Sequence, residues 1–329
     1  MVIIVFTMDI KVKDTVFVFT LLLKVLILTG SVYYIYHHLF VKNDIVVFIS
    51  TFNNALSLGI NALLIFVVVL MMGLNWLLEA FKWKLLIDRI HVHNLKQAVK
   101  SILAGTTLGV FTPNRIGEVA GRLIFLKKEE RIIGLVLAGI GSLSQFFITI
   151  ILGLFAGVFL LKRNIIVDFN LYSFGQYLLV LILAGFFLVF VLIKYRRKAS
   201  SIFKFRSYLN VLRGFLPSEI FSVFVASFSR YIVFFFQFFI LLYVFNVTLN
   251  IQDALVILPS IFFVITVVPS FIIADIGIRG AVSVFFLGFV SSNEPGIFAA
   301  SLSLWLLNIA VPAIAGNFVI MQHRFKTNL

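Results

Sequence analysis

One glycine-rich stretch of the chain combines a proline with three charged side chains in otherwise apolar surroundings. If the chain is helical after Pro113, then Arg115, Glu118 and Arg122 share one helix face, because they are three and four residues apart. Two guanidinium groups beside one carboxylate leave positive charge that a phosphate could neutralise. The alternative is a surface turn in which these side chains only pair with one another. We expect an anion-binding site here, with Pro113 and Gly117 as its hinge.

A second stretch breaks an apolar run in a related way, with Pro269 followed by Asp275, Gly277 and Arg279. Asp275 and Arg279 are four residues apart, so they can pair on one helix face. Both stretches join a proline, an Ile-Gly pair and nearby charges. Broken helices in the two halves of a membrane protein are typical of internal repeats, with the substrate site where they meet. We predict that Pro269 and Gly277 form a second hinge.

Arg230 lies inside a phenylalanine-rich apolar run, where a single Arg costs roughly 2.5–3.5 kcal/mol on the insertion scale. Glu118 and Asp275 are the candidate counter-charges, and the alternative is that Arg230 extends to the inner membrane interface. Charged groups at membrane depth persist when they are paired or face a polar cavity. We therefore predict that one cavity between the two halves is lined by Glu118, Arg122, Arg230, Asp275 and Arg279. The predicted substrate-binding set adds Arg115 to these five residues.

The elements that must position these residues are membrane-spanning helices. The chain is 62% hydrophobic and only 12% charged, whereas soluble chains carry roughly 25% charged residues. Its apolar runs are continuous and reach the roughly 20 residues that a spanning helix needs. We predict an all-α, polytopic membrane protein that forms a single membrane domain over residues 1–329, with broken or re-entrant elements near 98–126 and 252–292.

About eight spans follow from the apolar runs. They are Val16–Phe40, Leu58–Phe81, Ile132–Leu161, Leu171–Ile193, Ile220–Phe245, Ala254–Ile273, Ala281–Val290 and Ile297–Ile320. Lys and Arg accumulate in cytoplasmic loops, and two basic segments, residues 82–100 and 194–213, therefore predict the inner side. Both termini then lie in the cytoplasm, and we expect a multi-pass protein of the cell (inner) membrane.

These residues resemble a known family, the flippase-like transmembrane region of lysylphosphatidylglycerol synthases. The first hallmark is similar to Pro113-Asn-Arg-Ile-Gly-Glu118 with Arg122, preceded by the basic stretch Glu79–Leu86. The second is similar to Pro269 and Gly277-Ile-Arg279, although Asp275 stands where the family usually has Gly, and Gly280 where it usually has Glu. The resemblance implies lipid handling, since relatives are thought to move an aminoacylated phospholipid between leaflets. We expect a stand-alone member without the soluble aminoacyl-transferase domain.

Three functions remain open from the sequence. The first is a lipid flippase-like transporter that moves an anionic or modified phospholipid, or a lipid-linked intermediate, between leaflets. The second is a non-transporting membrane subunit that docks a separate lipid- or glycan-modifying enzyme as its partner. The third, a membrane-embedded enzyme, lacks an evident nucleophile or carboxylate pair. We expect no cofactor, no metal site, because His91 and His93 have no acidic or Cys companions, and no nucleic-acid partner, because the basic residues lie between spans.

Overall fold

The computed structural model describes residue 33 and the ranges 49–53, 55, 59–90, 94–112, 115–162, 215–268 and 272–327. These residues form helices and no strand. In chain order the helices are α3 (Gly59–Ile87), α4 (Leu95–Val110), α5 (Gly117–Leu123), η3 (Lys128–Glu130), α6 (Arg131–Lys162), α9 (Pro217–Val244), α10 (Ile251–Val267), α11 (Ile272–Leu287), α12 (Glu294–Trp305), η4 (Leu306–Ala310) and α13 (Val311–Thr327). The predicted spans Val16–Phe40 and Leu171–Ile193 lie outside the described residues.

Four helical stretches are long and apolar enough to cross a bilayer, namely Gly59–Ile87, Lys128–Leu160, Pro217–Val244 and Glu294–Gln322. The shortest has 28 residues, which at 1.5 Å per residue gives about 42 Å, more than the ~30 Å of the hydrocarbon core. The last stretch continues from α12 through the π-helical turn η4 into α13. The predicted all-α, polytopic membrane fold is therefore confirmed.

Helix α3 extends further than the sequence indicated. We expected the span to end near Phe81, with Lys82 and Lys84 in a cytoplasmic loop, but the helix continues to Ile87. The side chain of Lys82 is only 1% exposed and pairs with Glu79 one helical turn earlier. A carboxylate at that spacing gives the lysine a partner, so the helix can keep it inside the protein.

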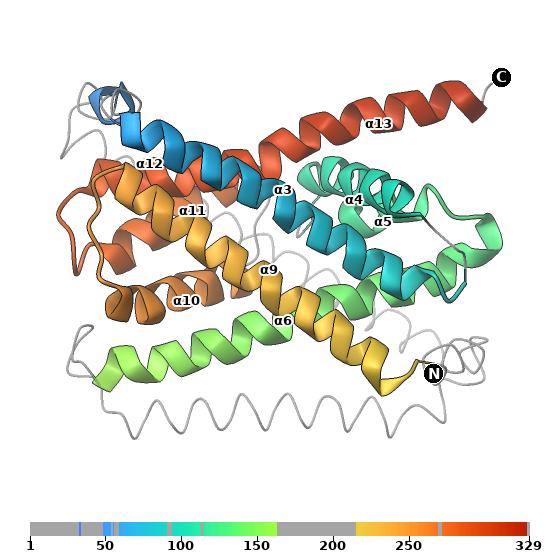
Figure 1. Ribbon diagram of the computed structural model, residues 1–329, viewed down its shortest axis with the longest axis horizontal. Coiled ribbons are helices and arrows are strands. Elements are labelled where there is room, and N and C mark those ends of the chain that lie inside the picture. Colours follow the sequence, from blue (N-terminus) through green and yellow to red (C-terminus); the bar gives the residue numbers. More distant parts are fainter. Residues whose placement is uncertain are drawn as a thin grey trace, which may run out of the picture.

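The two predicted broken stretches are pairs of short helices. Helix α10 has 17 residues and ends where Val268 adopts an extended conformation, because a residue that precedes a proline is disfavoured in the α region. Helix α11 then begins at Ile272, nine residues before the predicted span at Ala281. Helices α4 and α5 form the other pair. In Figure 1, α4 and α5 lie in one half of the molecule and α10 and α11 in the other, while α3 and α9 run diagonally through both.

Glycines allow α4 and α5 to pack at backbone contact. A Cβ at Gly121 would lie 2.5 Å from the carbonyl oxygen of Ala104, and a Cβ at Gly117 would overlap the carbonyl oxygen of Leu108. Gly117 and Gly121 thus form a small-residue face against which α4 packs. Helix α13 covers the other side of α4, where the Thr107 hydroxyl donates a 2.7 Å hydrogen bond to the Ala313 carbonyl. This close packing fixes α5 against the interior of the molecule.

Candidate functional site: a charged cavity between the long helices

A buried carboxylate on α3, Glu79, is the centre of the site. Its side chain accepts contacts from three cations, Arg122 at 2.7 Å, Lys82 at 2.7 Å and Arg230. These come from α5, from α3 itself and from α9, so one carboxylate joins three helices. We call Glu79, Lys82, Arg122 and Arg230 the Glu79 cluster. Glu79 is 5% exposed, which removes these ion pairs from the screening of bulk water.

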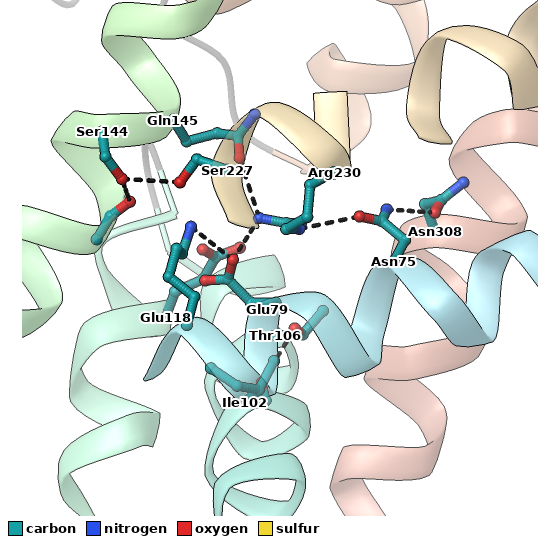
Figure 2. Close-up of polar contacts among 12 residues, drawn as sticks. Asn75, Glu79, Ile102, Thr106, Glu118, Ser144, Gln145, Ser227, Arg230 and Asn308 are labelled. Atoms are coloured by element: carbon teal, nitrogen blue, oxygen red, sulfur yellow. Dashed lines mark hydrogen bonds and ion pairs between the residues drawn. The ribbon is translucent and has the colours of Figure 1, made fainter. Parts of the chain in front are cut away.

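Arg230 is held by more than the carboxylate. Its Nε donates to Asn75 Oδ1 at 2.9 Å, and Asn75 Nδ2 donates to Asn308 Oδ1 at 3.1 Å in the π-helical turn η4. A longer contact of 3.5 Å joins Arg230 Nη1 to Gln145 Oε1 on α6. Figure 2 shows Arg230 between these partners, with Glu79 below it. The guanidinium is therefore held by groups from α3 and α6, and Asn308 of η4 orients Asn75.

This arrangement corrects the counter-charge that we expected for Arg230. The sequence offered Glu118 and Asp275, whereas the structure pairs Arg230 with Glu79. Helices α3 and α9 pack side by side, and this contact decides which carboxylate meets the arginine. The guanidinium is partnered within the protein, so the alternative of extension to the membrane interface is not observed.

Charged residues just before α5 and within it connect to the Glu79 cluster through successive ion pairs. Arg115 pairs with Glu118 at 2.6 Å, and Glu118 lies 4.0 Å from Arg122. Arg115 has a φ of 57° and precedes α5, so the predicted single helix face for Arg115, Glu118 and Arg122 is wrong for its first member. The left-handed backbone at Arg115 nevertheless returns its side chain to Glu118. The sequence pattern predicted that these residues lie close together, but it did not predict the backbone conformation that brings Arg115 to Glu118.

On α11, Asp275 and Arg279 pair at 3.0 Å, as their spacing predicts. The indole N–H of Trp305 on α12 also donates to Asp275 at 3.0 Å. Gly277 lies within α11, so it is not a hinge between two helices and that prediction is wrong. Gly117 begins α5, directly at a break, and its N–H donates to the Thr112 hydroxyl at 2.7 Å. Pro113 and Pro269 lie outside the described residues.

These groups surround one cavity of about 570 Å³. All six predicted residues line it: Arg115, Glu118, Arg122, Arg230, Asp275 and Arg279. The prediction that charged residues from the two broken stretches line one cavity is therefore confirmed. The wall has an apolar side as well, formed by α6, α9 and α10 with Phe146, Phe234, Phe262 and Ile265. A polar region and an apolar region thus meet in one space.

The cavity wall carries unused hydrogen-bond donors. Arg122 Nε, Trp76 Nε1 and the Tyr231 hydroxyl are buried and have no hydrogen-bond partner in the part of the chain that the structure describes, and all three residues line the cavity. Arg279 Nε lies 3.0 Å from Asp275 but is not aligned for a hydrogen bond. Buried polar groups normally have partners, so these three donors, which are enclosed in the wall, are hydrogen-bonding capacity that the described residues leave unused.

Sequence reasoning missed the most important residue of the site. Glu79 and Lys82 line the cavity together with Asn75 and Asn308, but the sequence indicates only a basic stretch, Glu79–Leu86, at the end of a span. The available signal was the position of Glu79 near the end of an apolar run, since an acidic residue at membrane depth is expected to be functional. The same argument about charge at membrane depth identifies Arg230, and Glu79 is the partner of Arg230.

The site favours binding of an anion over chemistry on a metal. Among the described residues no group of three His, Asp or Glu side chains is placed to hold a metal ion. The cavity instead combines fixed cations with an apolar wall. Such a site is suited to an amphiphilic ligand with an acidic headgroup.

Comparison with known families agrees with this architecture. The chain belongs to the family described as the Lysylphosphatidylglycerol synthase TM region, whose profile matches residues 21–316. Neither a curated protein nor a solved structure matches the chain. The fold and the family together define a multi-pass membrane protein from a family connected with lipid modification or flipping.

Proposed function

We propose that this protein is a lipid flippase-like transporter that binds an anionic or modified phospholipid, or a lipid-linked intermediate, and moves it between leaflets. The observation that carries this proposal is the Glu79 cluster, where three cations share one carboxylate at the wall of a cavity between long apolar helices. A lipid phosphate supplies negative charge and acceptor oxygens for cations that outnumber the carboxylates of this wall.

Each part of the cavity has a role in this proposal. Arg115, Arg122 and Arg279 contact the phosphate, while Glu118 and Asp275 hold these cations through the pairs described above. Glu79 and Arg230 fix the cluster between α3 and α9. The apolar side, with Phe146, Phe234 and Phe262, accepts the first carbons of the acyl chains.

The two broken helix pairs supply a route for movement. Helices α4 and α5 lie in one half of the molecule and α10 and α11 in the other (Figure 1), and both pairs contribute residues to the cavity wall. Paired broken helices around a central site are the arrangement found in transporters that expose the site to each side in turn. In the proposed orientation both termini lie in the cytoplasm, in the cell (inner) membrane.

Transport is tested with the full-length protein reconstituted into liposomes. Tail-labelled phosphatidylglycerol and tail-labelled phosphatidate are incorporated in separate preparations, and label in the outer leaflet is bleached with an impermeant reductant. We expect protein-containing vesicles to expose one of these lipids faster than empty vesicles. The Arg122→Gln variant should lose the acceleration, whereas Arg89→Gln, which removes an exposed pair with Glu219, should keep it.

The docking subunit is the alternative outcome of the same assay. Wild-type vesicles that move neither lipid faster than empty vesicles would reject transport. Co-purification of a lipid- or glycan-modifying enzyme with the inactive transporter would then support the non-transporting role.

A further inference from the structure

The charges around the cavity are not balanced evenly. Arg115 and Glu118 form one pair, and Arg279 and Asp275 form another. The Glu79 cluster has three cations for one carboxylate. Among the described residues that line the cavity, the whole formal excess of two positive charges therefore lies at this cluster.

This excess is buried. Lys82 is 1% exposed and Arg122 is 6% exposed, so bulk water and salt screen their charges poorly. An uncompensated charge inside a protein is costly, and more so at membrane depth. Arg122 Nε has no hydrogen-bond partner among the described residues, so part of the donor capacity at this cluster is unused there.

We propose that the ligand of this cavity presents two negative charges to the Glu79 cluster, as a phosphomonoester or diphosphate headgroup does. The inference rests on the proposed function and narrows it to one charge class of lipid. A phosphodiester brings one negative charge and leaves one positive charge unbalanced. A headgroup with an ammonium adds a like charge beside Lys82, and the carboxylates of the cavity already have cationic partners.

The geometry of the cluster fits a terminal phosphate. Its three cations come from three helices, α3, α5 and α9, around one point, and a terminal phosphate offers three strong acceptor oxygens. Trp76 and Tyr231 also belong to the cavity wall. Both are uncharged, so they leave this charge balance unchanged.

The test is a binding titration with the purified full-length protein in detergent at pH 7, where a phosphomonoester carries close to two negative charges, followed by tryptophan fluorescence, because Trp76 lines the cavity. The probes are dioctanoyl phosphatidate, a phosphomonoester, dioctanoyl phosphatidylglycerol, a phosphodiester, and inorganic phosphate. We expect phosphatidate to bind about tenfold tighter than phosphatidylglycerol, since it makes at least one more charge-assisted contact.

Two lysines two positions apart provide matched variants. Lys82→Gln lowers the local excess to one charge and should remove most of the preference for phosphatidate. Lys84→Gln, at a partly exposed lysine paired with Asp88, should leave the preference unchanged. If Lys82→Gln does not fold, Arg230→Gln makes the same change in charge from α9, and the comparison of lipids on the wild-type protein stands by itself.

The outcomes separate this inference from the proposed function. Equal affinity for the two lipids, or tighter binding of phosphatidylglycerol, would overturn the two-charge ligand and leave lipid binding intact. Binding of inorganic phosphate with no binding of either lipid would support the charge class but reject the lipid function. Binding of no probe by folded protein would overturn both.

Discussion

Replacing Glu79 by glutamine should destabilise the protein strongly, because this side chain balances the cations of three helices. Glu79→Gln keeps the shape of the side chain but leaves Lys82, Arg122 and Arg230 without their shared carboxylate. Breaking a buried ion pair by removing one partner costs roughly 3–5 kcal/mol. At roughly 2 °C per kcal/mol, the lower end of the range for larger domains, the midpoint of thermal unfolding should fall by about 6–10 °C.

The assay is thermal unfolding in detergent, followed by intrinsic tryptophan fluorescence. The matched control is Glu219→Gln, which removes a carboxylate from an exposed pair with Arg89, and such surface pairs contribute about 0–1 kcal/mol. Combining Glu79→Gln with Lys82→Gln removes one of the stranded cations and should recover part of the loss. A midpoint for Glu79→Gln as high as that of the control would refute the view that the cluster depends on this carboxylate.

Three further predictions concern the site, the packing and the topology. Arg122→Lys should retain the fold but bind phosphatidate more weakly in the titration above, because a lysine cannot reproduce the two-pronged contact of a guanidinium; unchanged affinity would contradict a direct phosphate contact. Gly121→Ala should lower the unfolding midpoint, since its Cβ would lie 2.5 Å from backbone atoms of α4 and overpacking costs about 1–3 kcal/mol. The control Gly139→Ala, whose Cβ would meet no described residue within 4 Å, should not lower it. The chain has no Cys, so single cysteine variants can report the topology. Ser292→Cys should react with an impermeant thiol reagent in intact cells, whereas Lys96→Cys should not. The reverse labelling would show that the proposed orientation is inverted.

The amino-acid sequence was sufficient for the class of protein and for much of the site. A bilayer requires long apolar helices, so α3, α6 and α9 follow from composition with boundaries within a few residues, except at the buried end of α3. The cost of a charge in that environment likewise identified Arg230, and the prolines identified the two broken stretches. These are local properties, and each can be recognised from residues that are neighbours in the chain.

Tertiary structure decided which charges meet. Arg230 pairs with Glu79 because α9 packs against α3, and no spacing along the chain specifies that contact over 151 residues. Arg115 reaches Glu118 through a left-handed backbone conformation, which a helical pattern cannot predict. The excess of positive charge at the Glu79 cluster also appears only when three helices are assembled, since Coulomb interactions depend on distance in space and not on separation in sequence.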